Sequence, residues 1–60
     1  MTYSFHITFA DGSNPYYHFP CAYGKHYRAL QRWANTYKLE KVKTVETNGN
    51  RLLFFIAKER

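Results

Sequence analysis

The sequence is poor in the features that mark secreted and membrane proteins. Its one cysteine, Cys21, cannot form an internal disulfide, whereas small secreted domains usually need several. Its longest apolar run, residues 52–57, is far shorter than the roughly 20 residues that span a bilayer. Residues 1–4 lack the charged and apolar regions of a signal peptide. We therefore expect a soluble, cytoplasmic protein of a reducing compartment that does not use a membrane.

Acidic residues are also scarce. Nine lysines and arginines stand against four aspartates and glutamates, which gives a formal net charge of +5. The stretch from Gly12 to Leu39 contains no acidic residue. This balance favours nucleic acid or an acidic protein surface as the partner. A content of 45% hydrophobic and 20% aromatic residues excludes a disordered tail. A length of 60 residues is enough for one domain, which we expect to comprise residues 1–60.

The first third of the chain predicts a β-hairpin. Residues 2–9 alternate between apolar and polar side chains, residues 10–15 are turn formers, and residues 16–19 are again aromatic. With residues 10–14 as the loop, the core face pairs Phe5 with Phe19 and Ile7 with Tyr17, and the other face pairs His6 with His18 and Thr8 with Tyr16. A slip of one residue would exchange the two faces of the second strand.

The rest of the chain predicts one helix and a second hairpin. Residues 24–37 form an amphipathic pattern whose apolar stripe contains Tyr23, Tyr27, Leu30, Ala34 and Tyr37, with His26 and Trp33 beside it. Residues 40–47 suit an exposed edge strand because lysines interrupt them. The Asn48-Gly49 pair favours a type I′ turn, and the apolar strand 52–57 follows it.

These elements define an α+β fold of order β-β-α-β-β, a four-stranded sheet with one helix packed on one face. The first and last strands are expected to be adjacent, parallel and central. This order is similar to that of β-grasp folds such as the small immunoglobulin-binding bacterial domains, a resemblance of fold alone. The predicted core contains Phe5, Ile7, Leu30, Trp33 and Phe54.

The helix is expected to carry a basic binding face. Lys25, Arg28 and Arg32 lie opposite its apolar stripe, with Lys38 just beyond it. Arg28 and Arg32 are four residues apart, where like charges are slightly destabilising. A helix selected only for stability would place glutamate there, so the pattern indicates a docking surface. The alternative is a solvated face that happens to lack acids.

The sheet face turned away from the helix is a second candidate surface. If Leu52, Phe54 and Ile56 pack inward, Leu53 and Phe55 point outward, and Tyr16 shares their face. No second helix remains to cover them, which favours an interface with another protein or with a second copy of the chain. Two alternatives are coverage by long neighbouring side chains and stacking on nucleic-acid bases.

Neither a metal site nor an enzyme is expected. The only candidate ligands, His6, His18, Cys21 and His26, do not follow zinc-site spacing. The four carboxylates are not paired for acid–base chemistry, and the three glycines form no phosphate-binding loop. No cofactor is therefore predicted.

The pattern as a whole predicts a small non-enzymatic binding protein that docks on nucleic acid or on a nucleic-acid-handling protein complex. The alternative is an inhibitor of the phage or mobile-element kind, similar in size to anti-CRISPR and anti-restriction proteins, that blocks a host defence enzyme. A second alternative is a structural subunit of an assembly, which would self-associate. Salt separates the first two, because binding to nucleic acid weakens steeply as salt rises.

Overall fold

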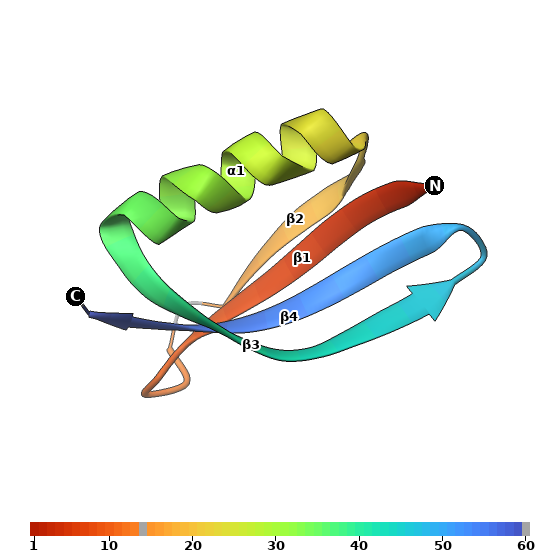
Figure 1. The fold of residues 1–60 in the computed structure, drawn as a ribbon. Coiled ribbons are helices and arrows are strands. Elements are labelled where there is room, and N and C mark those ends of the chain that lie inside the picture. The colour runs from red at the N-terminus through yellow and green to blue at the C-terminus, as the bar shows by residue number, and fades with distance from the viewer. Residues whose placement is uncertain (14, 60) are drawn as a thin grey trace.

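The computed structural model, which describes residues 1–13 and 15–59, has the expected α+β architecture (Figure 1). Its elements are β1 (Thr2–Phe9), β2 (Tyr16–Cys21), α1 (Tyr23–Thr36), β3 (Tyr37–Thr47) and β4 (Asn50–Glu59). The four strands form one sheet of order β2-β1-β4-β3, in which β1 and β4 are parallel and the two outer pairs are antiparallel. The prediction of a central parallel pair is confirmed. Asn14, which we assigned to the first turn, lies outside the described residues.

The second hairpin closes through the predicted Asn-Gly turn. Asn48 and Gly49 have φ angles of 42° and 78°, the positive values that a type I′ turn requires. The turn also anchors the N-terminus, because the Thr2 amide donates a 2.8 Å hydrogen bond to the Gly49 carbonyl. The Asn50 side-chain amide donates to Ser4 Oγ on β1 at 3.0 Å. The local turn thus helps to hold the start of β1 against the start of β4.

The first hairpin differs from the predicted register by one residue. Phe5 lies opposite His18 and Ile7 opposite Tyr16, so Tyr16 and His18 face the helix, and Tyr17, opposite His6, occupies the outer face. Phe19 lies in the irregular stretch between His18 and Cys21 and lines a groove beside α1. Tyr16 pairs with Ile7 instead of Thr8, which shifts β2 by one residue along β1. A bulge between Tyr3 and Phe5 then restores Cys21 to the inner face. Pro20 lies in this bulge, where its missing N–H is tolerated on an edge strand.

The two faces of β4 are the reverse of the prediction. The parallel ladder pairs Phe5 with Leu53 and Ile7 with Phe55, so Leu53 and Phe55 point toward the helix with the core. Phe54 instead pairs with His6 on the outer face, and its predicted place in the core is wrong. The fully buried core side chains are Phe5 and Ile7, with Ala57 beside them.

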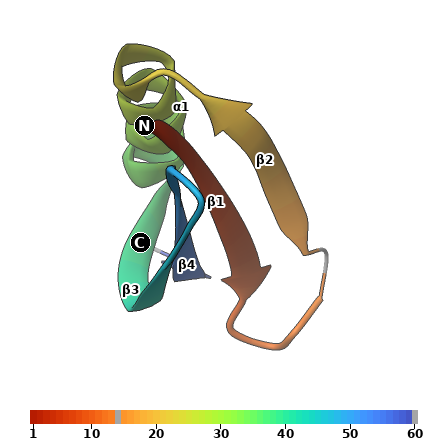
Figure 2. The ribbon, with the colours of Figure 1, turned by 90° about the vertical axis from the view of Figure 1, so that its right-hand side faces the viewer.

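The helix lies across one face of the sheet, as Figures 1 and 2 show. His26, Ala29, Leu30 and Trp33 face the sheet, whereas Tyr23 and Tyr27, predicted to be in the buried stripe, are exposed. The helix has no side-chain cap at its N-terminus, no acidic residue in its first turn and no basic residue in its last. Its stability therefore depends on packing rather than on capping or on charges that complement its dipole.

Candidate binding surfaces

The basic residues of α1 lie along one flank of the helix, next to strand β2. Lys25, Arg28 and Arg32 are all exposed, as predicted. With Ala29 they line a shallow groove of about 290 Å³ whose other wall is His18 and Phe19 of β2. Phe19 is 62% exposed, and one of its faces stacks on His18 with ring centroids 4.8 Å apart. The flank therefore combines three cations with an accessible aromatic ring; we call it the basic flank.

No acidic side chain of the described residues neutralises the cations of the basic flank. Neither Lys25, Arg28 nor Arg32 forms an ion pair within residues 1–13 and 15–59. The Arg28 Nε donates a 3.4 Å hydrogen bond to the Gly24 carbonyl one turn earlier, which holds that side chain along the helix surface. The charge of this flank is thus available to an external anion.

Two residues that we assigned to partner binding lie elsewhere. Lys38 is exposed but belongs to β3, where it lies opposite Lys58 on the outer side of the sheet, away from the basic flank. Tyr16 lies on the helix side, 5.2 Å from Trp33 between ring centroids, so it does not contribute to the open sheet face. Strand pairing determines the positions of both residues, and the sequence pattern alone does not specify that pairing.

The open sheet face carries a different set of residues from the predicted one. Leu52, Phe54 and Ile56 form its apolar row on β4, where Leu53 and Phe55 were expected. The Phe54 ring contacts His6 at 5.6 Å on one side and lies 4.8 Å from the Lys43 ammonium. Within the described residues no further helix or strand covers this face (Figure 2). These three apolar side chains are each only partly buried.

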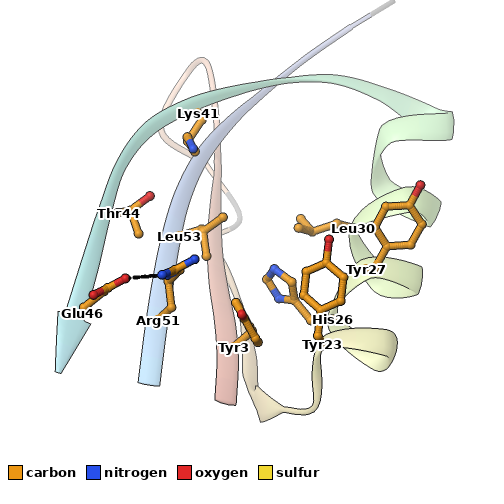
Figure 3. A pocket seen from close by; sticks show the side chains of 10 residues that line it. All are labelled: Tyr3, Tyr23, His26, Tyr27, Leu30, Lys41, Thr44, Glu46, Arg51 and Leu53. Atoms are coloured by element: carbon orange, nitrogen blue, oxygen red, sulfur yellow. Dashed lines mark hydrogen bonds and ion pairs between the residues drawn. The ribbon is translucent and has the colours of Figure 1, made fainter. Parts of the chain in front are cut away.

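A cleft of about 330 Å³ opens on the other flank of α1, between the helix and the β3–β4 hairpin (Figure 3). Leu30 and Leu53 form its floor, and the tyrosines at positions 3, 23 and 27 line it. Across the cleft Arg51 and Glu46 form an ion pair, and the Arg51 guanidinium lies 5.7 Å from the centre of the Tyr3 ring. Sequence reasoning missed this cleft, although Tyr23 and Tyr27, four residues apart, line the same side of a helix.

His26 is the most buried side chain of the helix and projects into this cleft (Figure 3). It is 3% exposed, and its Nδ1 is buried without a hydrogen-bond partner among the described residues. Burial lowers the pKa of His26 below its usual value, and the neighbouring His18 lowers it further. The imidazole is thus held neutral, with one buried polar atom unsatisfied.

No group of three or more His, Cys, Asp or Glu side chains in residues 1–13 and 15–59 is arranged to hold a metal ion. Over the same residues no helix is both long and apolar enough to cross a membrane. Comparison with protein-family models, with curated proteins and with solved structures found no match to this chain.

Proposed function

We propose that this chain is a non-enzymatic binding protein whose basic flank binds single-stranded nucleic acid. The observation that carries the proposal is the juxtaposition of three cations on α1, none ion-paired within residues 1–13 and 15–59, with the exposed ring of Phe19 on β2. Cations attract the phosphate backbone, and an accessible aromatic ring can stack on a base. Bases of a single strand are free to stack in this way, whereas those of a duplex are not.

The shape of the basic flank supports a strand rather than an isolated phosphate. Lys25, Arg28 and Arg32 are spaced three and four residues apart, so they follow the helix as a row on one side. A row of charges matches successive phosphates, while the groove wall of His18 and Phe19 faces the bases. An acidic protein surface would also bind this row of cations, but such a partner would not explain the exposed ring of Phe19 beside it.

The test is binding of a fluorescently labelled single-stranded oligonucleotide, measured by anisotropy. The double variant Arg28→Glu/Arg32→Glu and the single variant Phe19→Ala should each weaken binding, because one reverses charge and the other removes the stacking ring. Both sites are exposed, so circular dichroism should remain that of the parent.

The matched control is Lys38→Glu/Lys43→Glu, which makes the same change in net charge on the outer side of the sheet. If this control weakens binding as much as the helix variant does, only overall charge matters and the proposed site is wrong. If the parent binds no nucleic acid at low salt, the function itself is wrong.

A second candidate function rests on the open sheet face. Leu52, Phe54 and Ile56 form a continuous apolar row on the outer side of a central strand. Phe54 and Ile56 line a shallow hollow of about 410 Å³ together with His6 and Thr8. Such a row favours association with a second copy of the chain or with a host protein that the chain inhibits. Sedimentation equilibrium of the parent and of Phe54→Glu tests the dimer; a parent that is monomeric at high micromolar concentration excludes it.

A further inference from the structure

The cleft between α1 and the β3–β4 hairpin lies on the opposite flank of the helix from the basic flank. Tyr23, Tyr27 and His26 contribute to the cleft from α1, while Lys25 and Arg28 contribute to the groove beside β2. The two sites share no residue. The cleft is therefore a second site, distinct from the basic flank.

The walls of the cleft are aromatic and remain accessible. Tyr23 and Tyr27 are 60% and 56% exposed, and Tyr3 packs edge-on against Tyr23 with centroids 5.1 Å apart. Leaving two large aromatic side chains uncovered beside a leucine floor forgoes their burial energy. An aromatic ligand inserted between the helix and the hairpin would bury them.

The cleft also contains a cation that can pair with a ligand. Lys41, on β3, has no ion-pair partner within the described part of the chain and lies along the cleft with Thr44 (Figure 3). The acidic residue of the cleft, Glu46, is already occupied by Arg51, at 2.6 Å between Arg51 Nε and Glu46 Oε1. The cleft therefore offers a net attraction to an anionic group at the Lys41 end.

The third observation is the unsatisfied Nδ1 of His26. A buried polar atom without a partner is uncommon in a folded protein, and each instance calls for an explanation. Its ring is in contact with Tyr3 and Phe5, with centroid distances of 5.2 and 5.6 Å, so the imidazole is fixed by packing rather than by hydrogen bonds. His26 also lines the cleft, so a ligand with a polar edge seated there lies beside the ring that has this unsatisfied nitrogen.

We propose that this cleft binds a nucleotide unit, its planar base between the tyrosines and above the Leu30–Leu53 floor, and its phosphate at Lys41. A volume of about 330 Å³ lies at the lower end of small-ligand sites, which suits one nucleotide. The nucleotide is either a free mononucleotide or one unit of a nucleic-acid strand. The chemistry that recognises it is the same in both cases.

The experiment titrates the intact protein with adenosine and uridine monophosphates, and separately with adenosine and with ribose phosphate, by calorimetry. NMR shifts of the His26 ring protons report on the cleft. The mononucleotides should bind and shift His26, whereas loss of either the phosphate or the base should weaken binding about tenfold or more. Equal binding by all four compounds, or binding that leaves His26 unmoved, overturns the proposal.

Two pairs of variants test the residues. Tyr27→Leu and Lys41→Gln should each weaken mononucleotide binding about tenfold. Their matched controls, Tyr17→Leu and Lys43→Gln, change the same residue types on the outer side of the sheet and should have no effect. A control that weakens binding as much as its partner variant overturns the assignment.

His26→Phe separates a ligand-binding role from a structural one. Phenylalanine fills a similar volume without the unsatisfied nitrogen, so the midpoint of urea unfolding should be unchanged or raised while nucleotide binding falls. Lower stability with unchanged binding would show that the imidazole serves only the fold, and would overturn its role in the site. A single-stranded oligonucleotide, titrated into Tyr27→Leu, then identifies the source: weaker binding than the parent indicates a unit of the strand, and unchanged binding a free mononucleotide.

Discussion

The imidazole of His18 lies flat against the ring of Phe5, with centroids 4.9 Å apart and planes 5° from parallel. The stack joins the edge strand β2 to the centre of the core, since Phe5 is fully buried on β1. On its other flank His18 is stacked with the exposed Phe19, and its Nδ1 lies 3.0 Å from the Phe19 carbonyl, which accepts the hydrogen bond. Packing of the core therefore sets the position of the aromatic wall of the basic flank.

Replacement of Phe5 by leucine should weaken this connection without unfolding the domain. Leucine keeps most of the buried apolar area but removes the aromatic stack, so we expect a loss of about 1–2 kcal/mol in the free energy of unfolding. Urea titration measures the loss. In NMR spectra the His18 ring protons should lose the ring-current shift that the stacked Phe5 ring causes. A variant with parental stability and parental His18 shifts would show that the two rings are not stacked.

The two faces of β4 can be distinguished with one substitution on each. Phe55→Glu replaces an aromatic side chain packed on the core by a charged one and should cost several kcal/mol, enough to unfold so small a domain. Phe54→Glu places the charge on the open sheet face near Lys43 and should leave circular dichroism and the unfolding transition nearly unchanged. The opposite result, a folded Phe55→Glu and an unfolded Phe54→Glu, would support the orientation expected from the sequence, with Phe54 in the core and Phe55 on the open sheet face.

This strand also shows where sequence reasoning ends. Element order and the Asn48-Gly49 turn follow from local signals, namely alternation in residues 2–9, helical spacing and turn chemistry. The central parallel pair is the economical arrangement for that order. Residues 52–56 are apolar without interruption, so they contain no alternation that selects an inner face. Only pairing with β1, which brings Leu53 beside Phe5, selects it.

The same limit applies to the candidate sites. The exposed cations of α1 follow from helical spacing, but their aromatic neighbour Phe19 does not, because a one-residue slip and the bulge at Pro20 decide which face it occupies. The cleft depends on segments far apart in the sequence, with Tyr3 meeting Tyr23 and Arg51. Tyrosines have an apolar ring, so at helical spacing they resemble core residues even when they are exposed. For this reason Tyr23 and Tyr27 were assigned to the buried stripe.

Burial of His26 should make stability depend on pH below neutrality. Its pKa is lowered in the native state from the usual 6.5, so the unfolded chain takes up a proton at a higher pH than the folded one. The unfolding free energy should therefore fall as the pH drops through about 6.5 toward the lower native value, and be fully present above 6.5. Urea titrations between about pH 7.5 and 5.5 measure this slope.

The variant His26→Phe provides the comparison, because it keeps His6 and His18 and removes only the buried imidazole. Its stability should fall less than that of the parent over the same pH range. If both proteins lose stability in parallel, the other histidines or the carboxylates cause the dependence, and the buried neutral state of His26 contributes nothing measurable.

Salt provides the most quantitative check of the basic flank. If Lys25, Arg28 and Arg32 each neutralise one phosphate, the logarithm of the association constant for a single strand should fall with the logarithm of salt concentration with a slope of about −2. Raising salt from about 50 to 200 mM should then weaken binding about twentyfold. Anisotropy titrations at several salt concentrations give the slope directly.

Variants of the basic flank measure how much each residue contributes to this salt dependence. Arg28→Glu/Arg32→Glu leaves at most one of the three contacts, so its slope should have a magnitude of about 0.7 or less. Phe19→Ala should lower affinity at every salt concentration while keeping the parental slope, because stacking releases no counterions. A Phe19→Ala slope that falls with its affinity would mean that the ring orders the cations rather than stacking on a base. A parent whose binding barely responds to salt would point instead to an apolar protein interface, such as the open sheet face, as the working surface.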